Sequence, residues 1–448
     1  MTDYKILLQT TEIYKSKKLQ SFLLSLESKY NVDKINGQYS NLVNFSTNTS
    51  APYHQWFNYR EGFSGQLVLE LIKLSGAQKS EYIVDPFCGS GTTNVVATLN
   101  GYNTIGLDVN PMSAFIANAK ITYYTDIDLK NASLLHKKAL KHKTVKQFPE
   151  YLEIEKYFDS NNLQELLRIK TFIDTIPNSS AKTILLIAFI SIIIDCSNRK
   201  RDGNGLRIQH SKIADVNLAF SNKVKLILED IEKEQSSPGP KGYGLYGNAF
   251  DFYDTHIKPM DNVKVGTIIF SPPYANSFDY FESYKLELIL GGFAKGMKEV
   301  NKLRQNAIRS FVGNRMKSSS NNKFVELLAK EIEKTLPEKE KRTGKVDTRT
   351  RKVPNMIRSY FYDMHEVIRQ CSLSLDAGKR VYIVVDQSAY VGTIIPTDLL
   401  FAYFGEIENF KVERIIECRK ARTSPQQLKQ YPYLKAGLRE SIIELIKK

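Results

Sequence analysis

Glu81-Tyr-Ile-Val-Asp-Pro-Phe-Cys-Gly-Ser-Gly-Thr-Thr93 is the segment that decides the fold class of this 448-residue chain. A short apolar strand leads into a glycine loop, and a helix is predicted to begin near Thr92. Gly89 and Gly91 let the backbone approach a ligand closely, and the first amides of the helix are free to donate to it. A second strand, Thr104-Ile-Gly-Leu-Asp108, ends on a carboxylate 19 residues beyond Gly89. This spacing is typical of an acid that binds a ribose diol, whereas the lack of a third glycine disfavours a pyrophosphate ligand.

Another apolar strand is predicted over residues 266–270, and it ends in Ser271-Pro-Pro-Tyr274. Two prolines hold the residues after a strand rigidly at the carboxyl edge of the sheet, where open α/β sheets bind their ligands. The prolines lack backbone donors but keep carbonyl acceptors, beside the Ser271 hydroxyl and the Tyr274 ring. This set can accept hydrogen bonds from an exocyclic amine while stacking on its ring. Taken alone, the tetrapeptide is equally typical of an ordinary Pro-Pro loop with a core tyrosine.

Together the two motifs resemble a known family. Asp85-Pro-Phe-Cys-Gly-Ser-Gly-Thr-Thr93 is similar to the S-adenosylmethionine-binding motif of amino-group DNA methyltransferases, which modify N4 of cytosine or N6 of adenine, and Ser271-Pro-Pro-Tyr274 resembles their catalytic tetrapeptide. Residues 54–68 are similar to the segment that covers the methionine end of the cofactor in this family. The resemblance covers roughly residues 50–118, 243–292 and 378–448.

The resemblance implies a site that holds S-adenosylmethionine and no metal. Its catalytic residues are Ser271, Pro272, Pro273 and Tyr274. Its cofactor-binding residues are Asp85, Phe87, Gly89, Ser90, Gly91, Thr92, Asp108, Asn248 and Phe63. Asp108 is expected to bind the ribose, the alternative being a mere strand-end carboxylate. Asn248 is expected to meet the adenine amine, although family members often carry Asp there.

Seven strands are predicted, at 81–85, 103–108, 243–249, 266–270, 379–386, 410–418 and 440–447. Helical patterns between the early strands predict an α/β fold with a doubly wound, Rossmann-like sheet and a helical insert. The resemblance implies the methyltransferase variant of this sheet, in which the last two strands form an antiparallel hairpin.

The motif order divides the chain into five parts. These are 1–119 with the cofactor-cover segment and the first half of the methyltransferase domain, 120–240 as a helical insert, 241–293 as the catalytic half, 294–355 as a basic and mobile insert, and 356–448 as the last part of the sheet. Because the last strand ends the chain, DNA recognition is expected from the inserts, above all from 120–240. The basic loop 197–206 inside it is expected either to touch phosphates or to be a solvated turn. The apolar run 183–196 is too short to span a bilayer and is predicted to be a buried helix.

Composition favours a polyanionic partner. Lys and Arg outnumber acidic residues 63 to 48, a net charge of +15, and residues 300–352 alone carry a net +9. Binding to double-stranded DNA would explain this excess of positive charge, but a soluble basic protein without such a partner would show it as well. The four cysteines, Cys88, Cys196, Cys371 and Cys418, are far apart, which argues against a zinc site or disulfides and favours the cytoplasm. Cys88 is expected to be a packing residue rather than a nucleophile, and the first residues lack the apolar core of a signal peptide.

The resulting hypothesis is a site-specific DNA methyltransferase that acts on a base flipped out of the duplex. By resemblance, Ser271 favours N4 of cytosine, in a restriction-modification setting with a separate endonuclease. The alternatives are an N6-adenine DNA methyltransferase, an RNA base methyltransferase and a DNA-binding protein without turnover. The short stretch before Glu81 argues against the RNA enzyme, since such enzymes usually carry a sizeable RNA-binding domain there. The sequence leaves the recognition site and the oligomeric state open.

Overall fold

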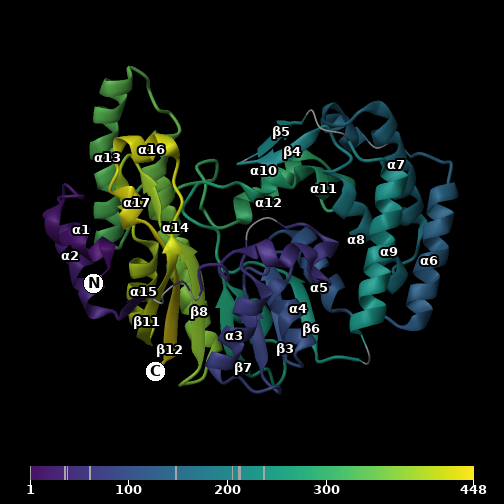
Figure 1. Ribbon diagram of the computed structural model, residues 1–448, viewed down its shortest axis with the longest axis horizontal. Helices are drawn as coiled ribbons and strands as arrows, with labels where there is room; N and C mark the ends of the chain where they lie inside the picture. The colour runs from purple at the N-terminus through teal and green to yellow at the C-terminus, as the bar shows by residue number, and fades with distance from the viewer. Residues whose placement is uncertain are drawn as a thin grey trace.

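An eight-stranded sheet runs through the computed structural model, in the order β1-β11-β12-β8-β7-β2-β3-β6 (Figure 1). The structure describes residues 2–34, 37, 39–59, 62–146, 149–203, 205–209, 213–235 and 238–448. The strands are β1 (Val32–Lys34), β2 (Tyr82–Asp85), β3 (Asn103–Asp108), β4 (Arg199–Asp202), β5 (Gly205–Ile208), β6 (Gly242–Tyr246), β7 (Val265–Phe270), β8 (Arg380–Asp386), β9 (Ser388–Tyr390), β10 (Thr393–Ile395), β11 (Phe410–Lys420) and β12 (Arg439–Lys447). β4 with β5 and β9 with β10 form two separate hairpins.

The sheet is parallel from β8 to β6, while β12 runs antiparallel to both β8 and β11. All seven predicted strands are present, and the third, expected at 243–249, ends at Tyr246. The predicted count of seven is one short, because β1 pairs in parallel with β11 at the edge of the sheet. Its sequence, Val-Asp-Lys, has no apolar pattern that would reveal a strand, since an edge strand can be held by backbone hydrogen bonds alone.

Helices cover both faces of the sheet, among them α14 on one face and α3 on the other. The α-helices of the structure are α1 (Asp3–Thr10), α2 (Lys17–Lys29), α3 (Gly65–Ser75), α4 (Thr92–Leu99), α5 (Pro111–Ile121), α6 (Asp126–Lys141), α7 (Ser160–Thr175), α8 (Ser180–Ile192), α9 (Val216–Glu234), α10 (Tyr280–Ser283), α11 (Lys285–Leu290), α12 (Met297–Asn306), α13 (Lys323–Thr343), α14 (Val353–Ser374), α15 (Thr397–Ile407), α16 (Pro425–Gln430) and α17 (Leu434–Gly437). None of these helices is long and apolar enough to cross a membrane.

Alternate residues of the central strands enter different cores. Ile268 and Phe270 of β7 belong to the same buried core as Met356 of α14, whereas Ile269 between them belongs to the core that contains Leu71 of α3. Side chains alternate across a strand, so this division follows directly from the sequence. Every residue of β7 is buried, as expected of a parallel strand covered on both faces. The sheet is therefore a rigid frame, and its strand ends hold their side chains in fixed positions.

Between β3 and β6 the chain leaves the sheet and forms a helical group to one side, α6 to α9 (Figure 1). The apolar run predicted as a buried helix is α8 and the turn after it, and its apolar residues from Ile184 to Cys196 contribute to a core shared with α9. The β4–β5 hairpin follows α8. It lies over α10, the short helix after Ser271-Pro-Pro-Tyr274, and thus brings the helical group back toward the sheet's carboxyl edge.

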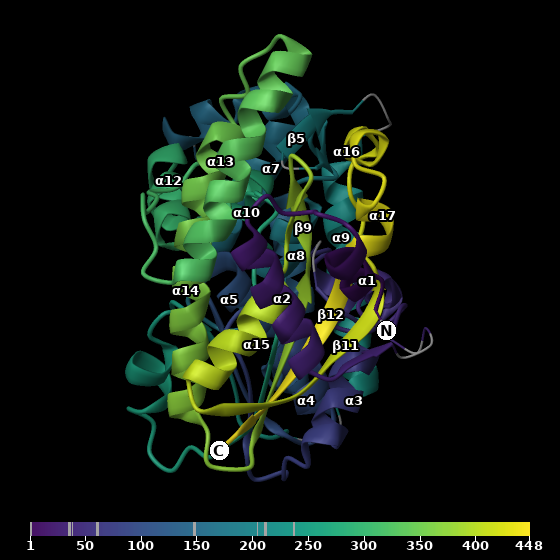
Figure 2. The same ribbon diagram turned by 90° about the vertical axis from the view of Figure 1, so that its left-hand side faces the viewer.

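Residues 294–355 have more order than their composition predicts. They contain α12 and the 21-residue α13, which packs along α14 (Figure 2). Apolar side chains of α13 recur at helical spacing and are buried: Phe324, Val325, Leu328, Ala329, Ile332 and Leu336. Because many charged residues lie between these apolar positions, the overall composition of the segment does not reveal the amphipathic helix.

Candidate active site

Four neighbouring parallel strands end on polar residues at one edge of the sheet. In the order β8, β7, β2 and β3, these are Asp386, Ser271 directly after Phe270, Asp85 and Asp108. The carboxyl edge of an open α/β sheet is where such folds bind ligands. The four side chains therefore form one row, with Ser271 between two acids on one side and a third acid on the other.

This row opens into a cavity of about 350 Å³. Of the thirteen residues predicted for the site, twelve line it: Phe63, Asp85, Phe87, Gly89, Ser90, Thr92, Asp108, Asn248, Ser271, Pro272, Pro273 and Tyr274. Gly91 does not. It is the N-cap residue of α4 and has a φ of +86°, and a Cβ there would lie 2.9 Å from Ala117 Cα. Its glycine is thus required for a left-handed backbone and for the close packing of α4 on α5.

The glycine loop is covered by Tyr59, which lies in neither of the two motifs. Gly89 has a φ of +52°, and a Cβ there would come within 3.0 Å of the Tyr59 ring. The Tyr59 ring stacks on Tyr284 with centroids 5.0 Å apart. Tyr59 belongs to the segment 54–68 predicted to cover the cofactor, of which Arg60 and Glu61 lie outside the described residues. The covering role of this segment stays a prediction, and the structure places the Tyr59 ring against Gly89.

Asp85 and Asp108 are both held by hydrogen bonds within the loop. Asp85 accepts from Thr93 Oγ1 at 2.6 Å and from the Phe87 amide at 2.9 Å. Asp108 accepts from the Gly89 amide at 3.0 Å and from the Asn110 amide at 2.8 Å. Burial raises the pKa of Asp85 to about 7 and that of Asp108 to about 6. Among the described residues no Lys or Arg pairs with either carboxyl, so the two buried acids favour a ligand that brings positive charge and hydroxyl donors.

Asn248 lines the cavity two residues beyond β6. Its Nδ2 donates to the Asn306 carbonyl at 3.0 Å, and its Oδ1 accepts from the Phe250 amide at 3.1 Å. A carboxamide oxygen has two lone pairs, so Oδ1 keeps the capacity to accept from a ligand amine. The bond to Asn306 fixes the orientation of the side chain.

The tetrapeptide holds its serine and tyrosine together. Ser271 Oγ donates to the Tyr274 hydroxyl at 3.1 Å, and Tyr274 also hydrogen-bonds to the Glu440 carboxylate. Burial raises the pKa of Tyr274 well above its usual range, so the phenol stays neutral. Ser271 Oγ keeps free acceptor lone pairs that face the cavity, beside the fixed carbonyls of the two prolines.

Several lining residues come from parts of the chain far from the two motifs: Asp386, Arg419, Arg422 and Glu440. Asp386 carried a usable signal, because it ends an apolar strand just as Asp85 and Asp108 do. The other three come from β11, the loop after it and β12, and no local pattern distinguishes them from ordinary surface charges.

Cys88 also lines the cavity, but burial raises the pKa of its thiol well above the usual range. A neutral thiol is a poor nucleophile, which agrees with a packing role. All four cysteines are buried and free. Among the residues that the structure describes, no group of three or more His, Cys, Asp or Glu is arranged to hold a metal ion.

Comparisons with known proteins point to DNA methylation. Residues 9–119 match the family model described as DNA methylase. The chain is 27% identical over 472 residues to the type II methyltransferase M.BsoBI of Geobacillus stearothermophilus, covering 94% of this chain and 91% of that protein. It is 27% identical to the type II methyltransferase M.AvaI of Nostoc sp., covering 84% and 82%. Similarity to the type II methyltransferase M.MvaI of Kocuria varians is 28% over 200 residues, or 42% and 43% of the two chains.

Proposed function

We propose a reaction for this chain from the premise that it belongs to the amino-group DNA methyltransferase family, whose methyl donor is S-adenosylmethionine. The proposed reaction is methylation of the exocyclic amine of a base flipped out of duplex DNA, with N4 of cytosine as the acceptor. One observation carries this proposal: a single cavity is lined both by the glycine loop with its two strand-end acids and by Ser271-Pro-Pro-Tyr274.

The residues over β2 and β3 fit the cofactor. Asp108 would accept hydrogen bonds from the ribose hydroxyls, and Asp85 would order the loop or approach the amino group of the methionine end. Phe63 and Phe87 provide apolar surface, and Asn248 keeps an acceptor for the adenine amine. When bound, S-adenosylmethionine supplies the methyl group and a sulfonium positive charge, which two buried carboxyls favour.

The residues after β7 fit the base. The lone pair of an exocyclic amine is delocalised into its ring, so the enzyme has to hold the nitrogen in a geometry that frees the lone pair. Ser271 Oγ and the Pro272 carbonyl would accept the two amine hydrogens, and their rigid placement favours attack without a covalent enzyme intermediate. Tyr274 would stack on the base, which must leave the duplex because its amine is otherwise paired.

Cofactor affinity is expected to depend on pH. Asp108, with a pKa of about 6, binds hydroxyls best when ionised, and Asp85 has a pKa of about 7. Protons then compete with the ligand below these values. The dissociation constant for S-adenosylmethionine, measured by calorimetry from pH 5 to 8, should be lowest at pH 8 and rise as the pH falls through 7 and 6. An affinity that improves toward pH 5 would contradict ionised carboxyls in the site.

The choice of cytosine rests on serine at the first position of the tetrapeptide, which resembles the cytosine-modifying members. N6 of adenine is the runner-up. An RNA base methyltransferase and a DNA-binding protein without turnover are further alternatives. An assay that offers a labelled methyl group to DNA and to RNA distinguishes these alternatives, and we expect label on DNA alone. Label on RNA alone would favour an RNA enzyme. Cofactor binding without methyl transfer would favour the non-catalytic alternative.

We also propose that the helical insert 120–240 reads the DNA, through the β4–β5 hairpin. A two-stranded ribbon fits the major groove. Arg201 is buried, pairs with Glu287 and donates from Nε to the Ser283 carbonyl at 3.3 Å, which anchors the hairpin to the helices after the tetrapeptide. Lys200 and Arg207 are exposed and stand directly opposite each other. Asp202 pairs with Arg207 at 3.0 Å and offsets part of the repulsion between the two cations, and an anionic partner would relieve the rest.

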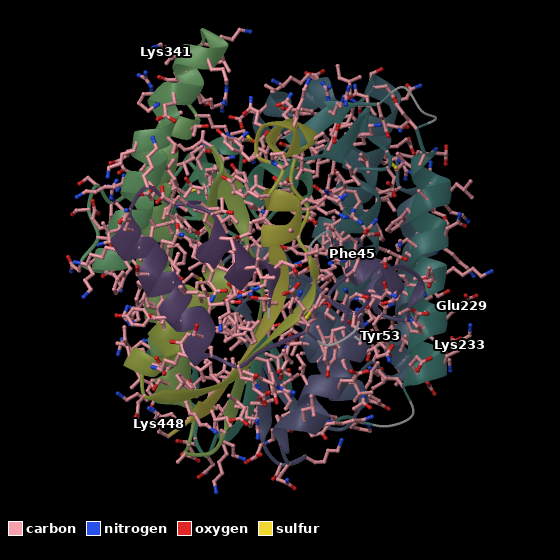
Figure 3. All side chains as sticks on the ribbon, turned by 60° about the vertical axis from the view of Figure 1, so that its left-hand side comes forward. Phe45, Tyr53, Glu229, Lys233, Lys341 and Lys448 are labelled. Atoms are coloured by element: carbon pink, nitrogen blue, oxygen red, sulfur yellow. The ribbon has the colours of Figure 1, made fainter. Side chains whose placement is uncertain are left out.

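Neutralising both residues, Lys200→Gln with Arg207→Gln, should weaken DNA binding and reduce the slope of log K against log salt by about 0.9 for each phosphate that is no longer neutralised. If either side chain contacts a base edge instead, the preference for the target site falls as well. The matched control is Lys225→Gln with Lys233→Gln, which removes the same charge from α9, where Figure 3 shows Lys233 on the outer surface. Equal salt slopes for the two double variants would argue against the hairpin.

The second insert is proposed to contact the DNA backbone. Part of its charge is neutralised internally, since Arg351 pairs with Glu340 at 2.7 Å and Lys339 with Asp347 at 2.5 Å. Arg349 donates to the Ser277 carbonyl at 3.4 Å, close to the tetrapeptide, and Lys341 lies at the projecting end of α13 (Figure 3). These positions suit phosphate contacts beside the cavity and farther along a duplex.

A separate restriction endonuclease is proposed as a functional partner, as the type II relatives suggest.

A further inference from the structure

Two carboxyl groups occupy the base side of the cavity and have no part in the reaction described so far. Asp386 ends β8, and Glu440 of β12 is its direct partner in the antiparallel ladder. Side chains of such a pair lie on the same face of the sheet, with Cβ atoms about 4.5–5.5 Å apart. Both line the cavity together with Ser271 and Tyr274. They lie on the side of β7 opposite to Asp85 and Asp108, which fit the cofactor.

The two carboxyls differ in how they are satisfied. Glu440 is 5% exposed and accepts from Arg419 Nε at 2.5 Å and from the Tyr274 hydroxyl. Asp386 Oδ1 is buried and has no hydrogen-bond partner within the described part of the chain. An unsatisfied buried carboxyl oxygen is costly, and Asp85 and Asp108 avoid this cost by accepting two hydrogen bonds each. Asp386 is therefore the strand-end acid that a ligand could complete.

The pKa of each carboxyl in the pair is raised, which favours a proton on the pair. Burial, and after it the charge of Glu440, raises the pKa of Asp386 well above its usual range, while Arg419 opposes the shift. Burial also raises the pKa of Glu440, against Arg419, Arg422 and Tyr274. Asp398 is a further acid that acts on Asp386 from α15. Two neighbouring carboxyls that share one proton offer an O–H donor as well as acceptors.

The pairing edge of the base determines which donors it needs. Beside the exocyclic amine, cytosine presents two acceptors, the ring nitrogen N3 and the carbonyl O2. Adenine presents one acceptor, N1, followed by a C–H group. In the proposed function, Ser271 and Pro272 accept hydrogen bonds from the two amine hydrogens. The rest of the pocket therefore has to donate hydrogen bonds to the acceptors of the base. Arg422, exposed at the cavity, provides a guanidinium beside the carboxyl pair.

Resting on the proposed function, we propose that Asp386 is a specificity-determining residue that donates a hydrogen bond from its carboxyl group to the ring nitrogen of the flipped base, with Arg422 as the donor to O2 of cytosine. The pocket then holds one acceptor set for the amine and two donors in line with it. This order complements cytosine along its whole pairing edge and leaves one donor unused by adenine.

The test replaces an atom of the substrate. After sequencing of modified bases has located the target site, synthetic duplexes carry cytosine or 3-deazacytosine there, the latter with C–H in place of N3. The wild type should lose about tenfold or more in kcat/KM on the deaza duplex, the size of one hydrogen bond to a base edge. Asp386→Ala should be slow on cytosine but show nearly the same kcat/KM for both duplexes. Asp386→Asn, which keeps an N–H donor, should restore discrimination.

The comparison is a double-mutant cycle, so altered amine reactivity or pairing of the analogue affects all variants alike and cancels. Unchanged S-adenosylmethionine affinity shows that the variants are folded. A wild type that treats both duplexes equally, or an Asp386→Ala variant that discriminates as strongly as the wild type, overturns the inference. If adenine proves to be the methylated base, 1-deazaadenine tests the ring-nitrogen contact in the same way, and the role given to Arg422 is wrong. Absence of methyl transfer to any DNA contradicts the proposed function instead.

Discussion

Replacement of Asp108 by alanine should weaken S-adenosylmethionine binding by about 1.5–3 kcal/mol, or roughly 10- to 150-fold, while the fold is kept. The reason is the loss of a charged acceptor for two ribose hydroxyls at the end of β3. Titration calorimetry gives the dissociation constant directly. Asp108 also accepts from the Gly89 and Asn110 amides, so some of the loss could come from a loosened loop.

Two further variants separate these contributions. Asp108→Asn keeps a carbonyl acceptor for a loop amide but removes the charge, and we expect an intermediate affinity. Glu413→Ala removes an acid that pairs with Lys411 at 2.7 Å outside the cavity, and its affinity should match the wild type. A dissociation constant for Asp108→Ala within twofold of the wild type would remove Asp108 from the cofactor site.

Replacement of Tyr274 by alanine should lower turnover on duplex DNA, at a cost of about 1–3 kcal/mol because the ring no longer stacks on the flipped base. Tyr274→Phe keeps the ring and should be much less affected. It still loses the hydroxyl that accepts from Ser271 Oγ at 3.1 Å, so a small fall in kcat from a less fixed serine is expected.

Steady-state kinetics on a duplex with the target site gives both values. A fluorescent base analogue at the target position reports extrusion separately: the alanine variant should show less unstacked analogue than the phenylalanine variant. Affinity for S-adenosylmethionine should be unchanged in both. If the two variants lose turnover equally, the ring does not stack on the base and the hydroxyl network accounts for the effect.

The sheet could be predicted from sequence because parallel strands covered on both faces are short apolar runs. β7, with six consecutive buried residues, is the clearest case, and β8 follows the same rule up to the acid that ends it. β1 could not be predicted, since its place at the edge depends on backbone pairing with β11 and not on its side chains. α13 was hidden in a similar way, by charges between its buried apolar residues.

Whether a site residue could be predicted also depends on whether its position is fixed by the local sequence or by tertiary packing. Residues in the two motifs could be found because glycines and prolines impose their backbone geometry locally. Arg419 and Glu440 reach the cavity through tertiary packing, from segments whose local patterns carry no such signal, whereas Tyr59 lies in the segment 54–68 that the resemblance had placed over the cofactor. Asp386 is the exception, because it repeats the strand-end acid of β2 and β3, and a search for that feature alone would have included it.

The most direct test of the account is the identity of the methylated nucleoside. DNA is incubated with the protein and methyl-labelled S-adenosylmethionine, hydrolysed to nucleosides and analysed by mass spectrometry, with Ser271→Ala as the control for transfer at this site. We predict label in N4-methyldeoxycytidine, strongly reduced in the control. Label in N6-methyldeoxyadenosine would contradict the choice of base, and label that survives Ser271→Ala undiminished would contradict the site itself.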